Sequence, residues 1–192
     1  MATKKVLTVV KDDVVISIGN TIGVHYSDIT DQTFKLNAVA TAKNTGNTVS
    51  GTFLFTVNGV DLSKISKSFD VSSYDILASF IPTDTKNYNN SQITVSNGYV
   101  VSSTDVYITL TLTPSTIIYG TVCKSSMFAA TAVDANGNTI LGTFAYTING
   151  APFKEQILGT GLYDIDVIFT PSTPTNYTVK YDSDKNGNGN NK

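Results

Sequence analysis

The chain has 192 residues, a formal net charge of −2 and 41% hydrophobic residues, enough to bury the core of one large or two small domains. It contains one Cys, one His and no Arg, which excludes an intramolecular disulfide framework and leaves no basic footprint for nucleic acid. No stretch approaches the length of a transmembrane helix, so no membrane insertion is expected.

Residues 1–13 contain a short apolar run, Val6 to Val10, that is interrupted by Thr8. The run is too short for a signal-peptide core, so a chain that starts at Met1 is expected not to use the general secretory route. At an offset of 93 residues, "KKVLTVVKDDVVISI" aligns with "NGYVVSSTDVYITL", as if a last strand stood without its own domain. Three interpretations stay open: an extra edge strand on the next domain, a strand that pairs with another chain, or a truncated domain.

Alternation of apolar and polar residues predicts strands in both halves of the chain, because a period of two places side chains on one face of a pleated strand. No window of helical length has helical spacing, and about seven strands are expected in each half. The apolar positions are Phe34, Leu36, Ala38 and Ala40; Phe53, Phe55 and Val57; Tyr74, Ile76, Ala78 and Phe80; Phe144, Tyr146 and Ile148; and Tyr163, Ile165, Val167 and Phe169.

Two phrases are repeated almost unchanged. "GTFLFTVNG" (51–59) recurs as "GTFAYTING" (142–150), and "YDILASFIPTDTKNY" (74–88) recurs as "YDIDVIFTPSTPTNY" (163–177). Conserved blocks with small changes of spacing are typical of duplicated domains. The sequence therefore predicts an arm at 1–13, a first domain at 14–101, a short linker at 102–105, a second domain at 106–182 and a flexible Asn/Gly tail at 183–192.

Turn residues agree with this division. Asn58-Gly59 and Asn149-Gly150 each follow an alternating run, and Asn-Gly readily adopts the positive φ angles of a two-residue hairpin turn. The tyrosines that follow the last repeated strand, Tyr88 and Tyr177, are predicted to bury their rings and to bond their hydroxyls to backbone.

The run "GTFLFTVNG…YDILASFIPTDTKNYNNSQITV" resembles the bacterial immunoglobulin-like repeat of the group 3 type, and the second copy resembles it as well. The resemblance covers nearly the whole chain. It implies an all-β protein of two tandem immunoglobulin-like antiparallel β-sandwiches. It also implies a spacer, stalk or adhesive module of bacterial surfaces or of virus and phage particles, with no catalytic residues to carry over.

The C-terminal tail holds a weak calcium candidate. Asp182, Asp184 and Asn186 fit the first half of a calcium loop, D-x-D-x-N-G. The loop would need a bidentate acid at its twelfth position, and no flanking helices are predicted. The alternative is a flexible tail without metal, and no other cofactor is expected.

Three further groups of residues were considered as sites. His25 and Cys123 lie in different domains and lack the companions of a catalytic triad or a zinc site, so His25 is expected at the surface and Cys123 in a half-buried position. Asp75, Asp164 and Asp166 lie opposite the apolar stripes, which predicts solvated strand faces. No catalytic residues are therefore expected, and the chain is predicted not to be an enzyme.

Two functions remain from the sequence. The first is a structural protein of a virus or phage particle, located on the particle surface and bound to capsid or other particle proteins, with the N-terminal strand as one contact. It reconciles modules of an extracellular type with a start that resembles no export signal. The alternative is a bacterial cell-surface adhesin or carbohydrate-binding module, with a host-surface glycan as partner. Both rest on fold analogy.

Overall fold

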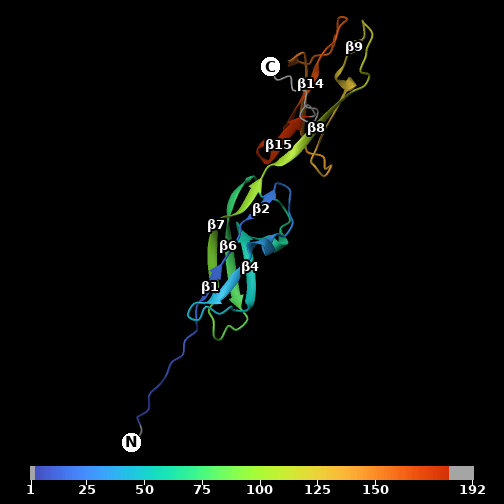
Figure 1. Cartoon of the computed structure of the whole chain (residues 1–192). Coiled ribbons are helices and arrows are strands. Elements are labelled where there is room, and N and C mark those ends of the chain that lie inside the picture. Colours follow the sequence, from blue (N-terminus) through green and yellow to red (C-terminus); the bar gives the residue numbers. More distant parts are fainter. Residues whose placement is uncertain (1–2, 182–192) are drawn as a thin grey trace. The chain divides into compact units, whose positions relative to one another are not determined.

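The computed structural model describes residues 3–181 and divides the chain into two compact units, Met1–Ser102 (unit 1) and Ser103–Lys192 (unit 2) (Figure 1). Strands β1–β7 lie in unit 1 and strands β8–β15 in unit 2. The described residues contain four short 3-10 helices and no α-helix. The all-β fold class predicted from the alternating pattern is confirmed.

Unit 1 has a five-stranded sheet, in the order β2-β7-β6-β4-β5, and a two-stranded sheet, β1-β3. The pairs are antiparallel except for β2 and β7, which run parallel. The elements are β1 (Val14–Ser17), β2 (Ile22–His25), η1 (Thr33–Leu36), β3 (Val39–Ala42), β4 (Gly51–Val57), β5 (Val60–Asp61), η2 (Leu62–Lys64), β6 (Ser72–Pro82) and β7 (Ser91–Ser102).

The core of unit 1 consists of two clusters. The β1–β3 cluster packs the two-stranded sheet against β6 and contains Val14, Ile16, Ala40, Ala42, Val49 and Phe80. The β6–β7 cluster lies further along the five-stranded sheet and contains Ile22, Val24, Leu36, Val57, Leu62, Ile76, Tyr99 and Val101. Strand β7 contributes the last two of these residues, so the second cluster depends on β7 being in place.

Unit 2 has three small sheets, β10-β8-β15, β12-β11-β14 and β13-β9. Strand β15 pairs parallel to β8. Its core cluster contains Val106, Ile108, Ala132, Ile140 and Phe169. The elements are β8 (Thr104–Leu112), β9 (Val122–Cys123), η3 (Ser125–Met127), β10 (Phe128–Val133), β11 (Gly142–Ile148), β12 (Ala151–Pro152), β13 (Gln156–Ile157), β14 (Ile165–Pro171), η4 (Pro174–Asn176) and β15 (Tyr177–Tyr181).

The predicted hairpin turns are confirmed. Asn58 and Gly59 have φ angles of 49° and 77° and join β4 to β5, and Asn149 and Gly150, at 50° and 77°, join β11 to β12. Positive φ at both turn residues is the geometry that matches the twist of the flanking strands. The predicted strand through Phe34 is wrong, because residues 33–36 form helix η1 and pairing starts only in β3.

Two expectations about the connections need correction. The predicted linker 102–105 is mostly strand, because β7 ends at Ser102, β8 begins at Thr104 and only Ser103 lies between them. The interpretation of residues 6–10 as an edge strand of unit 1 is also wrong. Residues 3–11 have no strand pairing, and the first pairing is a single parallel bridge between Asp12 and Tyr88.

Tyrosines anchor both units. The ring of Tyr88 packs against the β1–β3 cluster and that of Tyr177 against the core of unit 2, as predicted for both rings. Two other tyrosines form an equivalent pair of hydroxyl bonds. Tyr74 donates to the Asp70 carbonyl oxygen at 2.8 Å, and Tyr163 donates to the Gly159 carbonyl oxygen at 3.2 Å.

Hydrogen-bonded aspartates are expected to make the folded state less stable in acid. Hydrogen bonds lower the pKa of five carboxyl groups below 3.8, each mainly through a neighbouring side chain; the donors are Asn89 for Asp13, Thr30 for Asp28, Ser63 for Asp61, Asn87 for Asp84 and Asn138 for Asp134. A pKa that is lower in the folded state stabilises the fold above the unfolded value, and this stabilisation is lost as pH falls through the folded value.

We therefore expect the urea midpoint of unfolding to hold between pH 7 and pH 5 and to fall steadily below pH 4. The D134N variant should show a smaller fall than the parent chain, because it removes one of the shifted groups. An equal midpoint at pH 7 and pH 2.5 would contradict this role for the turn aspartates.

Candidate functional site

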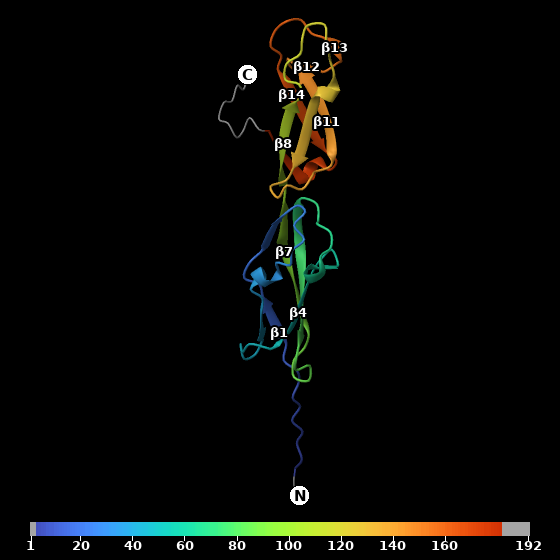
Figure 2. The ribbon, with the colours of Figure 1, turned by 90° about the vertical axis from the view of Figure 1, so that its right-hand side faces the viewer.

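Strands β11, β12 and β14 form one sheet of unit 2 (Figure 2). An open groove with a volume of about 270 Å³ lies at the end of this unit where β14 begins. One wall is the segment 114–119 that follows β8, and the other is the segment 158–163 that precedes β14. The remaining lining residues are Leu112, Cys123, Met127, Phe128 and Ile165. The groove is lined mainly by aliphatic and aromatic side chains, which suit an apolar segment rather than a charged ligand.

In unit 1 the corresponding space is occupied by the end of β7. Tyr99 pairs with Tyr74 of β6 on one side and with Ile22 of β2 on the other. Val101 lies opposite Ser72 and Val24 in the same way. Tyr99 and Val101 are only 4% and 3% exposed, so β7 is the central strand of the β6–β7 cluster.

The repeat relates the two regions. The shared "YDI" sequence and the matching hydroxyl bonds make Tyr163 the equivalent of Tyr74, and Ile165 the equivalent of Ile76. The sheet of unit 2 ends at β14, and no strand pairs with its outer edge within residues 103–181. Ile76 is fully buried, whereas Ile165 is only half-buried.

The wall at 114–119 shows the same difference. It follows β8 as β2 follows β1, and Tyr119 aligns with Tyr26 of unit 1. In unit 1 this region is strand β2, where Val24 is 6% exposed, but in unit 2 it has no strand pairing and the equivalent Ile117 is half-buried. Within residues 103–181 no strand lies between the two walls of the groove.

The sequence that follows β15 differs in composition from β7. Strand β15 begins at Tyr177 and pairs with β8 from Thr104, as Tyr88 bridges to Asp12 in unit 1. The positions that would continue into a strand like β7 fall in "DSDKNGNGNNK" (182–192), which has no apolar side chain. Such a sequence cannot provide buried residues in the places of Tyr99 and Val101.

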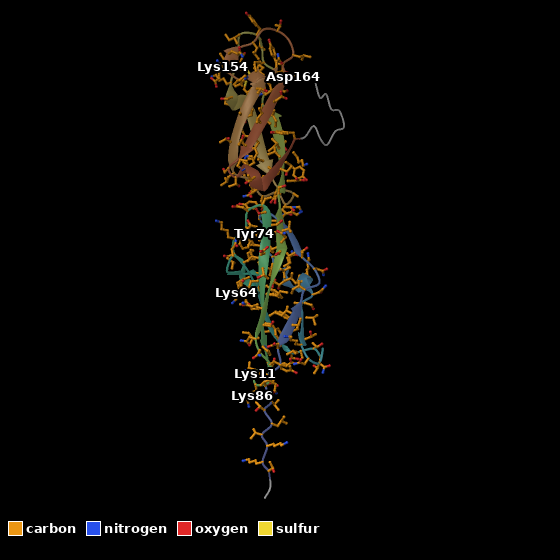
Figure 3. The ribbon with its side chains drawn as sticks, turned by 90° about the vertical axis from the view of Figure 1, so that its left-hand side faces the viewer. Lys11, Lys64, Tyr74, Lys86, Lys154 and Asp164 are labelled. Atoms are coloured by element: carbon orange, nitrogen blue, oxygen red, sulfur yellow. The ribbon has the colours of Figure 1, made fainter. Side chains whose placement is uncertain are left out.

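The N-terminal arm, residues 3–11, is the second unusual feature. It extends beyond the strands of unit 1, and its side chains project with no strand beside them (Figure 3). Val6, Leu7, Val9 and Val10 are 82–89% exposed. The arm starts from a fixed point, because Asp12 donates to the Asn87 carbonyl oxygen at 2.8 Å and accepts from the Asn89 amide at 2.9 Å.

The candidate residues from the sequence stay separate from one another. His25 is exposed at the end of β2, and Cys123 is buried in β9, where burial and then Glu155 raise the pKa of its thiol. Cys123 was predicted to be half-buried, and the structure shows that it is buried. A thiol of raised pKa has little thiolate at neutral pH, which is unfavourable for a nucleophile.

The strand carboxylates have local partners. Asp75 accepts from the Asn97 amide at 2.9 Å, and Asp166 accepts from the Thr147 hydroxyl at 3.3 Å. Asp164 belongs to unit 2 and Asp75 to unit 1, and both are exposed. Within residues 3–181 no three His, Cys, Asp or Glu side chains gather as a metal site would require. Asp182, Asp184 and Asn186, the calcium candidate, lie outside the described residues.

The comparisons with known proteins give little more. No protein-family model matches the chain, and a search of curated proteins found no match. Among solved structures, the chain is similar to the fibronectin(III)-like modules of Clostridium thermocellum CbhA, with 16% identity, 87% of this chain and 93% of that chain covered, and a TM-score of 0.27. No helix in the described part of the chain is long and apolar enough to span a membrane.

Proposed function

We propose that the protein is a non-enzymatic structural protein of a virus or phage particle, built from β-sandwich modules. The observation that supports this role is the pair of apolar surfaces that the fold of a single chain leaves open. The arm exposes four large aliphatic side chains, and unit 2 has an apolar groove. Surfaces of this kind are buried when a protein assembles with others.

The connection between the units also supports a structural role. Only Ser103 lies between β7 and β8, so the last strand of unit 1 is followed almost at once by the first strand of unit 2. Short connections between modules suit a spacer better than a catalytic domain, which needs convergent titratable side chains in a cleft. The expected partners are capsid or other particle proteins, and the expected location is the particle surface.

Particles that lack the protein provide the test. We expect negative-stain images of wild-type particles to show a projection or a surface layer, and particles from a gene-deletion strain to lack it. An antibody against unit 1 should label the wild-type particles only. Unlabelled wild-type particles with unchanged density in the deletion strain would overturn the proposal.

The bacterial cell-surface adhesin or carbohydrate-binding module is the second outcome of the same experiment. Under that alternative the antibody would label bacterial cells, and the purified chain would bind a glycan array. Phe34 and Tyr119 are 74% and 72% exposed and could stack on sugar rings. Binding that is lost in a double Phe34→Ala, Tyr119→Ala variant would favour this alternative.

A further inference from the structure

We propose that the N-terminal arm of one copy of this chain inserts beside the segment that leads into β14 of unit 2 in a second copy and supplies the last strand of that unit. The arm would pair mainly with residues 161–163, directly before β14, fill the groove, and link copies head to tail. This inference deepens the proposed structural role, because it names the partner as a second copy.

The structure fixes the register between the arm and β7. Val14 and Ile16 of β1 face the core, as Val106 and Ile108 of β8 do, and Ile16 pairs with Ala40 of β3 as Ile108 pairs with Ala132 of β10. The bridge from Asp12 to Tyr88 likewise matches the pairing of Thr104 with Tyr177. The offset is therefore 92 residues, from Val14 to Val106, and not the 93 read from the sequence alignment.

One residue of register changes which arm side chains are buried, since alternate residues of a strand face opposite sides. At an offset of 92, Leu7 takes the place of Tyr99 and Val9 takes the place of Val101. Both places in unit 1 are buried. Val10 takes the place of Ser102, which is exposed. The arm therefore has apolar residues at both positions that the β6–β7 cluster of unit 1 needs.

The receiving side matches by the same register. Tyr99 pairs with Tyr74 and Val101 with Ser72, so Leu7 would lie opposite Tyr163, and Val9 opposite Gly161. On the other side of the new strand, the segment 114–119 could pair as β2 pairs with β7. Insertion would complete a second core cluster in unit 2.

Charge supports the same pairing. The backbone N–H of Asn97 in β7 donates to the Asp75 carboxylate at 2.9 Å, which places this position of the strand beside that carboxylate. At an offset of 92, Lys5 occupies the position of Asn97, and Asp164 is the equivalent of Asp75. A lysine of the arm would thus lie beside an exposed carboxylate of unit 2, and electrostatic complementarity of this kind favours correct register.

The connection favours a second copy over an unrelated partner. Within the chain, the last strand of unit 1 passes to the first strand of unit 2 through Ser103 alone. Val10, Lys11 and Asp12 hold the equivalent positions, so insertion of the arm into another copy would reproduce that junction between chains. The described part of each chain carries both the donor arm and the acceptor groove, and head-to-tail contacts that do not close on themselves form filaments.

Two adjacent valines provide a matched test on the full chain. Val9→Asp places a charge at a buried position of the inserted strand, and Val10→Asp places the same charge on its exposed face. By sedimentation velocity over a range of concentrations, we expect the parent and Val10→Asp chains to form a ladder of linear oligomers. The Val9→Asp chain should stay monomeric, with association weakened at least about tenfold.

Both substitutions should leave the folding of unit 1 intact, because residues 3–11 have no strand pairing within it and Val9 and Val10 are 85% and 82% exposed. Equal weakening by the two substitutions, a monomeric parent chain at all concentrations, or closed dimers in place of a ladder would each overturn the proposal. These results would leave the particle role open, since that role is tested by the particle images and does not require self-association.

Discussion

Replacing Ile76 by alanine is expected to destabilise unit 1 by about 2–5 kcal/mol, whereas the equivalent Ile165→Ala should destabilise unit 2 by much less in the isolated chain. Ile76 is 0% exposed within the β6–β7 cluster, and its removal would leave a cavity among packed side chains. Ile165 is only half-buried and lines the open groove. The same substitution thus measures whether the second cluster has formed in each unit.

The measurement is urea unfolding of a chain that lacks residues 2–11, followed by hydrogen exchange of peptides assigned to each unit. Ile81→Ala serves as the control, because Ile81 lies in the same strand as Ile76 but is 55% exposed. Addition of a peptide of residues 3–12 should raise the effect of Ile165→Ala toward that of Ile76→Ala. An unchanged effect of Ile165→Ala with saturating peptide would argue against the arm as the completing strand.

Alanine at Gly51 or Gly142 is expected to destabilise the respective unit by about 3 kcal/mol, because each glycine lies against the next strand with no room for a side chain. A Cβ at Gly51 would lie 2.4 Å from the Ile81 carbonyl oxygen and 2.4 Å from the Phe80 ring. A Cβ at Gly142 would lie 2.4 Å from the Thr170 carbonyl oxygen. Both contacts are closer than van der Waals distance and involve backbone that cannot move without loss of pairing.

Gly23→Ala is the matched control in a strand. A Cβ there would meet nothing within 4 Å, so its effect should be near zero or slightly stabilising. Thermal unfolding of the three variants checks the contrast. A Gly51→Ala melting temperature equal to that of Gly23→Ala would show that β4 and β6 are not as close as described.

Much of the fold could be predicted from the sequence because the signals are local. Alternation identified the faces of β4, β6, β11 and β14, and Asn-Gly pairs identified two hairpin turns. The strand predicted through Phe34 failed because residues 33–36 form a 3-10 helix that buries Leu36 but leaves Phe34 74% exposed, so the two side chains do not share a face. The parallel pairings of β2 and β15 could not be predicted, since they depend on contacts between distant segments.

Of the two parts of the candidate site, the sequence predicted the arm but not the groove. The apolar arm could be recognised from its resemblance to the end of the first unit, but its register was off by one residue. The apolar positions of the arm and of β7 align almost equally well at either offset. The pairings of Ile16 with Ala40 and of Ile108 with Ala132, together with the Asp12–Tyr88 bridge, decide between them. The groove was not predicted, although residues 182–192 contain no apolar side chain, which indicated that they could not repeat the buried positions of β7.

The most direct test of the central claim is a disulfide formed between two different chains. In a Cys123→Ala background, Thr8→Cys is placed in one chain and Leu162→Cys in another, at positions equivalent to the pair Val100 and Ser73 of β7 and β6. When the two chains are mixed and oxidised, we predict a covalent heterodimer that Val9→Asp in the donor chain abolishes. A mixture that stays monomeric under non-reducing electrophoresis, or that cross-links equally with Val9→Asp, would contradict the donated strand.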